Sequence, residues 1–241
     1  MIERVARFVT GVACCGLFVL TRVAGADPNV EKYYLDVDAR IDSRDPNENF
    51  GVSTTARVVV NGDDGSLVRS VFELPDDIWS VSSGQLISAT VHFYLWEDNT
   101  EDRTVSLHPL TTGFVEGTGD GTESGDGVTW LTYDGVNAWG TPGGDYDPNV
   151  FVTPVESTNW FTWDITGLWE NTDLRSYGAM LRMDDESDPG PGNKPRAPFT
   201  SSDGSGGNLP YVELTYVPEP GSLAILVLLT GAVAVRRRGL G

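Results

Sequence analysis

The chain has 241 residues, and its 35 acidic side chains outnumber its 16 basic ones, which gives a pI near 4.2. A protein surface this acidic repels nucleic acid and anionic membranes, so we expect no nucleic-acid partner. Both cysteines, Cys14 and Cys15, lie in an apolar N-terminal run. A disulfide framework and a cysteine metal site are therefore excluded from the chain that follows this run.

The N-terminal 26 residues have the layout of a secretory signal peptide. Arg4 and Arg7 precede the apolar run 8–20, and the small residues Ala24 and Ala26 frame a cleavage site. We therefore expect export and cleavage after Ala26.

Residues 27–216 are predicted to form one all-β domain. Short alternating segments are separated by Gly, Pro, Asn and Asp, and no apolar period of 3.6 extends over helical length. About 190 residues can bury a full core as a single β-sandwich. The predicted strands are 34–41, 56–60, 68–74, 87–96, 104–108, a short one near Phe151, 160–165, 178–183 and 211–216. A total of about eight strands predicts a jelly roll.

Two features of this pattern are especially clear. Residues 61–65 supply the positive-φ residues that a hairpin turn needs between 56–60 and 68–74. Strand 87–96 alternates strictly, and its odd-numbered members are predicted to face the core. These members are Ile87, Ala89, Val91, Phe93 and Leu95.

Aromatic residues are the candidates for sugar binding, because an aromatic face stacks on the apolar face of a pyranose. His92, Tyr94 and Trp96 share the outer side of strand 87–96 and could form a platform, unless another loop covers that side. Trp160 and Trp163 are three apart on a strand and cannot share a face, so at least one is predicted to lie in the core.

Two stretches, 116–146 and 184–205, are predicted to be long loops. Loops above about 12–15 residues are uncommon in compact domains and are often functional, so we expect any site to involve them. Trp130 and Trp139 lie in the first loop, where they either contact a ligand or anchor the loop.

Carboxylates suggest calcium, which takes six to eight oxygen ligands. Two groups are candidates, and a solvated acidic surface is the alternative explanation for both. The first is Asp36, Asp38 and Asp42, near Asn47 and Asn49; the second is Asp184, Asp185, Glu186 and Asp188. Neither has the spacing of an EF-hand loop.

Catalysis has little support in the sequence, and we predict that the protein is not an enzyme. His92 and His108 are the only histidines, and neither a nucleophile elbow nor a zinc-protease motif occurs. A glycosidase that uses two carboxylates remains the open alternative, because 33 acidic residues lie between 27 and 218.

A succession of short motifs resembles the DNRLRE-domain family. The motifs, in chain order, are Asp38 with Ile41-Asp42-Ser43, then Pro46, Asn49 and Gly51, Arg69-Ser70 with Phe72, Ile87 to Thr90, Thr129-Trp130, Trp160-Phe161 with Trp163 to Thr166, Tyr177-Gly178, Phe199 to Ser202, and Pro210-Tyr211. The family consists of bacterial extracellular jelly rolls similar to carbohydrate-binding modules, some of which bind acidic polysaccharides. The resemblance implies the same fold and a polysaccharide partner.

The last 25 residues resemble a PEP-CTERM sorting tail. The sequence Val217-Pro218-Glu219-Pro220 leads into an apolar segment that ends at the cluster Arg236, Arg237 and Arg238. The segment 223–235 is shorter than the roughly 20 residues that cross a bilayer, so we expect only transient insertion. The arginines predict a cytoplasmic C-terminus, and the resemblance implies a membrane protease, an exosortase, that processes the tail.

The sequence thus predicts an exported, non-catalytic protein of the cell surface or extracellular matrix that binds or packs with polysaccharide. A structural matrix protein without a specific ligand is the second hypothesis, and a glycan-cleaving enzyme is the third.

Overall fold

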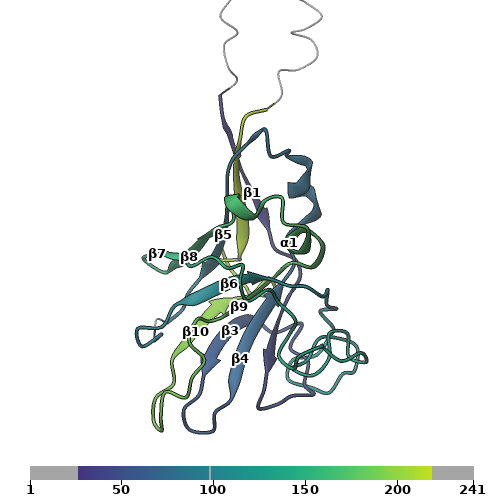
Figure 1. Ribbon diagram of the computed structural model, residues 1–241, viewed down its shortest axis with the longest axis vertical. Helices are drawn as coiled ribbons and strands as arrows, with labels where there is room; N and C mark the ends of the chain where they lie inside the picture. The colour runs from purple at the N-terminus through teal and green to yellow at the C-terminus, as the bar shows by residue number, and fades with distance from the viewer. Residues whose placement is uncertain (1–26, 98, 219–241) are drawn as a thin grey trace, which may run out of the picture.

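The computed structural model describes residues 27–97 and 99–218, which form two antiparallel sheets that pack face to face (Figure 1). The predicted all-β sandwich is confirmed. The predicted signal peptide and the sorting tail from Glu219 onward lie outside the described residues. Among the helices of the described part, none has the length and apolar character needed to cross a membrane.

The first sheet has five strands, and the second has six. The first sheet has the order β1 (Asn29–Tyr34), β11 (Tyr211–Tyr216), β5 (Leu86–Tyr94), β8 (Trp160–Asp164) and β7 (Val155–Ser157). The second has the order β10 (Arg196–Thr200), β3 (Thr55–Val60), β4 (Leu67–Phe72), β9 (Ala179–Met183) and β6 (Val105–Pro109), and β2 (Asp38–Asp42) also pairs with β4.

Helical structure in the described chain is limited to three short elements. The 3-10 helices are η1 (Asp76–Ser80) and η2 (Thr166–Leu168), and the single α-helix is α1 (Thr172–Tyr177). Asn171 begins α1, because its side-chain oxygen accepts hydrogen bonds from the backbone N–H groups of Asp173 and Leu174. Gly178 ends it with a φ of 76°, a conformation that favours glycine.

The main core fills the space between the sheets. Every second residue of β5, β8 and β11 points into this core, where it packs against the inward residues of β3, β9 and β10. Its largest fully buried side chains include Trp163, Phe72, Phe93 and Phe199. Trp163 also donates a hydrogen bond to the Val105 carbonyl at 2.9 Å, whereas Trp160 faces outward. The prediction that these two tryptophans take different faces is confirmed.

The predicted strand count of about eight is too low, because the structure has eleven. The predicted strand 34–41 is two strands, β1 and β2, which lie in different sheets. β7 and β10 were not predicted, because both are short edge strands without a clear apolar pattern. The predicted strand near Phe151 is only an isolated bridge between Val152 and Leu107.

Strand 87–96 follows its predicted pattern except at Ile87, which is exposed. Residues Ala89, Val91, Phe93 and Leu95 are buried, as predicted. A β-bulge causes the difference, since Thr215 pairs with Ser88 but its neighbour Tyr216 pairs with Leu86. The extra residue places Leu86, instead of Ile87, against the core.

A second, smaller core lies under the predicted loop 116–146. Inward residues of that loop, among them Val128 and Trp139, pack on Ile41, Val71 and Met180 of the second sheet. The loop therefore forms a folded lobe that covers part of this sheet, and Figure 1 shows its coils beside β4.

Asn49 is the polar centre of this lobe. It is fully buried, and its amide nitrogen donates to the carbonyls of Glu116 and Val128 at 2.6 and 2.8 Å. Its side-chain oxygen accepts from the N–H groups of Gly51 and Gly119. A Cβ at Gly117 or Gly127 would come within 2.8 Å of this side chain, which is why the surrounding loop is rich in glycine.

Replacement of Asn49 by Ala should destabilise the protein strongly. The change leaves buried backbone donors and acceptors without partners, so we expect the free energy of unfolding to fall by about 2–4 kcal/mol in urea titrations. Asn47→Ala, at an exposed position two residues away, is the control and should cost about 0.5 kcal/mol or less. Equal effects of the two substitutions would contradict this account of the lobe.

Candidate functional site

Two adjoining hollows form a groove on the side of β3 and β10 that faces away from the main core. One has a volume of about 300 Å³ and the other about 240 Å³, and both are lined by Arg57, Val59 and Lys194. We call them together the cationic groove. Its further lining includes Trp96, Glu97, Arg196 and Pro198 at one end, and Arg40, Asp42, Arg44, Asp45, Glu48 and Phe50 at the other.

Trp96 projects at one end of the groove because β5 runs onto the edge of the second sheet. Leu95 forms an isolated bridge with Phe199, and the Trp96 N–H donates to the Pro198 carbonyl at 3.0 Å. The indole nitrogen donates to the Thr200 hydroxyl at 2.6 Å. The indole is thus fixed in position while 56% of the residue remains exposed.

The groove gathers positive charge in a strongly acidic protein. Between residues 27 and 218 the sequence has 10 basic and 33 acidic side chains. Five of the basic residues line the groove, against four acidic ones. The basic residues are Arg40, Arg44, Arg57, Lys194 and Arg196. The groove is therefore the place where an anionic ligand meets the least repulsion.

Several of these cations have unused bonding capacity. Neither Arg57 nor Lys194 forms an ion pair with any residue in the described part of the chain. The Nε atoms of Arg40 and Arg196 are buried and lack a hydrogen-bond partner there. The two Nε atoms are too buried to meet a ligand, so Arg57 and Lys194 are the cations of the groove that are suited to bind oxygen atoms of a ligand.

Local structure explains why the two central arginines face the groove. Arg57 alternates with the core residues Ala56 and Val58, and the Ser70 hydroxyl bonds both the N–H and the C=O of Arg57. The Arg40 guanidinium lies 4.1 Å from the centre of the Phe50 ring. Burial, and next the repulsion from Arg57, lower the pKa of Arg40.

The structure separates the three residues of the predicted aromatic platform. Trp96 belongs to the cationic groove, whereas His92 and Tyr94 stay on the outer face of the first sheet. Both ring nitrogens of His92 have hydroxyl partners, Thr90 at 2.8 Å and Thr162 at 3.0 Å. Burial lowers its pKa, so the imidazole is neutral at neutral pH.

The two tryptophans of the predicted loop 116–146 anchor the lobe. Trp139 is buried, and its indole nitrogen donates to the Thr129 carbonyl at 3.0 Å. Trp130 is partly buried, and the Arg69 guanidinium lies 5.2 Å from its ring centre. These contacts match the anchoring alternative for both residues.

The first predicted calcium group is dispersed. Asp38 is buried and accepts hydrogen bonds from the N–H and hydroxyl of Ser202, while Asp42 accepts from the backbone N–H of Arg44. Asp36 instead lines a separate hollow beside Glu73. Within the described residues, no three His, Cys, Asp or Glu side chains are placed to hold a metal ion.

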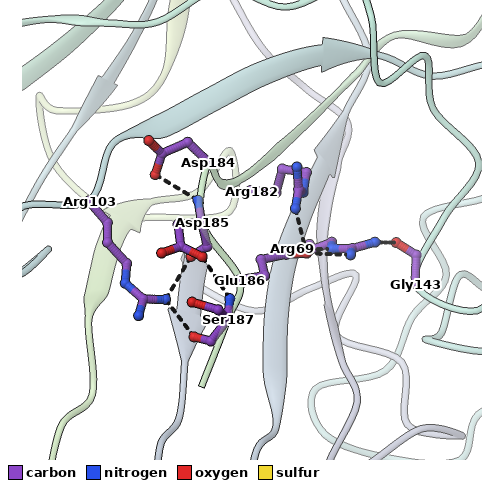
Figure 2. Close-up of polar contacts among 8 residues, drawn as sticks. All are labelled: Arg69, Arg103, Gly143, Arg182, Asp184, Asp185, Glu186 and Ser187. Atoms are coloured by element: carbon purple, nitrogen blue, oxygen red, sulfur yellow. Dashed lines mark hydrogen bonds and ion pairs between the residues drawn. The ribbon is translucent and has the colours of Figure 1, made fainter. Parts of the chain in front are cut away.

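The second predicted calcium group is held by internal donors (Figure 2). Asp184 accepts from the N–H of Thr104, and Asp185 from the N–H of Ser187. Arg103 donates to the backbone carbonyls of Asp185 and Ser187 at 2.7 and 2.9 Å. The loop that follows β9 thus uses its carboxylate and carbonyl oxygens to fix its own conformation.

Glu186, in the same loop, points inward and pairs with two arginines (Figure 2). Arg69 donates two hydrogen bonds to it at 2.9 and 2.7 Å, and Arg182 donates one at 2.6 Å. Arg69 also donates to the Gly143 carbonyl, so the cluster connects β4 with the lobe. Burial alone would raise the pKa of Glu186, but the two arginines outweigh it and lower that pKa.

Two neighbouring carboxyl groups, those of Asp38 and Glu116, have pKa values well above the ordinary range. Burial raises the pKa of Asp38 to about 7, against the opposing effect of its hydrogen bonds from Ser202. Burial likewise raises the pKa of Glu116 to about 7, and Glu116 accepts a hydrogen bond from the Asp38 N–H at 2.8 Å. Because Asp38 is 2% exposed, it is out of reach of a polysaccharide substrate.

Sequence reasoning identified Trp96 but missed the cations around it. The alternation in 56–60 could have placed Arg57 on the outer side of its strand. No local signal marks Lys194 and Arg196, which lie between prolines near an edge strand and reach the groove only through the β10–β3 pairing. In comparisons with known proteins, neither a family model nor a curated protein matches this chain.

Glu186→Gln should destabilise the protein by about 3–5 kcal/mol, because it leaves two buried arginines without a compensating charge. Thermal and urea unfolding measure the loss. Glu97→Gln is the matched control, since Glu97 accepts two hydrogen bonds from Arg196 on the surface and such pairs contribute about 0–1 kcal/mol. A loss below 1 kcal/mol for Glu186→Gln would contradict the structural role of this cluster.

Protonation of Asp38 and Glu116 should stabilise the folded protein at pH 5 relative to pH 8, against the opposite effect of His92 and His108, whose pKa values burial lowers. Asp38 and Glu116 have raised pKa values in the folded state, so the folded chain binds more protons than the unfolded chain between about pH 4 and 7. Their contribution is complete below pH 4 and is lost as the pH rises through 7. Asp38→Asn should lower the melting temperature at pH 5 relative to that at pH 8, whereas the exposed control Asp36→Asn should leave the relation between the two temperatures unchanged.

Proposed function

We propose that the protein is an exported, non-catalytic component of the cell surface or extracellular matrix whose sandwich binds polysaccharide in the cationic groove. The observation that carries this proposal is the exposed Trp96 beside a hollow that gathers half of the basic side chains of the body. An indole that stacks on a sugar ring, next to cations that bind its substituents, is a suitable arrangement for a charged glycan.

The ligand class follows from the cations. Guanidinium groups bind carboxylates through paired hydrogen bonds, and Lys194 adds an exposed ammonium group without an ion-pair partner in the described chain. We therefore propose a polysaccharide that carries carboxylates on its rings. The overall negative charge of the protein opposes contact elsewhere on its surface, which restricts such a chain to the groove.

The position of the groove suits a protein attached through its C-terminus. Asn29 pairs with Tyr216, so both ends of the described chain lie together, at the top of Figure 1. The loops before β4 and before β10, which contribute Ser66 and Lys194 to the groove, lie at the opposite end. A tail at the first end would leave the groove free to meet the matrix.

The proposal also covers the topology of the sandwich and the two ends of the chain. We propose that the sandwich has the jelly-roll arrangement, that residues 1–26 direct export, and that the tail that begins at Val217 directs sorting by a PEP-CTERM mechanism. The apolar part of that tail would then insert transiently in the inner membrane before an exosortase-type protease removes it. Calcium stays a possible ligand.

Trp96→Ala should weaken binding to alginate and polygalacturonate at least fivefold, which corresponds to an aromatic contact worth about 1 kcal/mol. The fold should persist, because the residue is largely exposed. Arg57→Ala should have a similar effect, and affinity should fall as sodium chloride rises, since exposed charges are screened. Isothermal calorimetry gives the affinities.

Phe151→Ala is the matched control, because Phe151 is 55% exposed and does not line the groove. It should leave the affinity unchanged. If the folded protein shows no saturable binding to either polysaccharide, the structural-matrix hypothesis replaces this proposal. Release of reducing ends from either one would instead support an enzyme.

A further inference from the structure

The outer face of the first sheet carries a connected set of aromatic rings. Tyr34, Tyr211 and His92 are consecutive partners across β1, β11 and β5, and Tyr94 and Trp160 pair in the next position. We call these five residues the aromatic face. They alternate with core residues on every strand, so their side chains point away from the interior.

The rings support one another. His92 stacks on Tyr211 at 4.4 Å, and the Trp160 ring lies 5.4 Å from both Tyr94 and Tyr211. The hydroxyl partners of His92 fix its ring as well. A surface held in this way loses little conformational entropy when a ligand binds.

The longest row of paired residues across the aromatic face runs over five strands, and the residues at its two ends are exposed to solvent. Tyr34, at the β1 end, is 56% exposed, and Val155, which pairs with Thr162 at the β7 end, is 70% exposed. A row that crosses five strands at about 4.8 Å spacing offers an extended, shallow contact for a chain of sugar rings.

The charges beside this face favour an uncharged ligand. The adjacent row carries Lys32, Glu213 and Asp164, and Lys32 is paired with Glu213 at 3.7 Å. Lys32 also lies 4.1 Å from the centre of the Tyr211 ring. The local net charge is negative, so a carboxylated chain is repelled, whereas the apolar faces of uncharged hexoses can contact aromatic rings.

The two surfaces lie on opposite sides of the sandwich. Residues of β3 and β10 alternate between the groove and the main core, and residues of β5, β8 and β11 alternate between that same core and the aromatic face. The core thus lies between the aromatic face and the part of the groove formed by β3 and β10.

We infer that the aromatic face is a second glycan-binding surface, specific for uncharged polysaccharide, and that one protein molecule can cross-link an uncharged chain to a carboxylated chain. The second surface stands on its own contacts. The cross-linking rests on the proposed function of the groove.

Electrophoresis in native gels that contain galactomannan or mixed-linkage β-glucan tests the second surface directly. The protein should migrate more slowly in at least one of these gels, and Tyr34→Ala combined with Trp160→Ala should weaken the apparent affinity at least fivefold. Trp96→Ala and Phe151→Ala should keep the retardation, and circular dichroism should report the same fold for all variants. Unchanged mobility of the protein in both gels overturns the second surface, whatever the groove binds.

A capture assay tests cross-linking with immobilised alginate and the fluorescently labelled uncharged polysaccharide that retards the protein. The protein should recruit the labelled chain to the alginate, and the Tyr34/Trp160 double variant should bind alginate without recruiting it. Trp96→Ala should reduce both signals together. Binding to alginate without recruitment overturns the cross-linking and leaves the proposed function standing. Retardation without alginate binding removes the proposed function and the cross-linking with it, and leaves the second surface standing.

Discussion

The burial of one apolar core between two twisted sheets determines the rest of this structure. β3 and β8 place alternate residues in that core, so the side chains of Arg57 and Trp160 must point outward on opposite sides. Both candidate surfaces therefore depend on the same set of buried residues, among them Phe93 and Trp163. A one-residue shift of any of these strands would move its outward side chains inside, and the bulge at Ile87 shows that such a shift is confined to a strand end.

Charge is distributed unevenly over this framework. Several acidic residues accept hydrogen bonds from nearby N–H groups, as Asp184 and Asp185 do in the loop of Figure 2. The buried Glu186 is paired with Arg69 and Arg182, whereas the buried Asp38 accepts hydrogen bonds from Ser202. Arg57 and Lys194, which have no carboxylate partner among the described residues, both line the groove. An anionic ligand can therefore bind in the groove although the protein as a whole is acidic.

Short-range signals in the sequence predicted the parts of the fold that short-range physics controls. The alternation of strand 87–96 and the opposite faces of Trp160 and Trp163 follow from the period of two, and the hairpin turn at 61–65 follows from its turn-forming residues. The edge strands β7 and β10 and the division of 34–41 between two sheets depend on distant partners. The candidate site likewise depends on a contact between distant residues that the sequence does not reveal. Trp96 lies near Arg196 because its neighbour Leu95 forms a bridge with Phe199 of the second sheet.

The lobe around Asn49 and the groove use opposite faces of β2, because Ala39 and Ile41 face the lobe whereas Arg40 and Asp42 line the groove. Residues Ala39, Ile41, Val71 and Met180 face the lobe, so the lobe covers the apolar surface of β2, β4 and β9 that would otherwise meet water. It is attached by this apolar core and by polar contacts: Asn49 bonds four backbone groups, and Glu116 bonds the Asp38 N–H. The outer residues of β3 and β10 stay accessible to the groove. A glycan chain there would contact strand residues such as Arg57 together with loop residues such as Lys194.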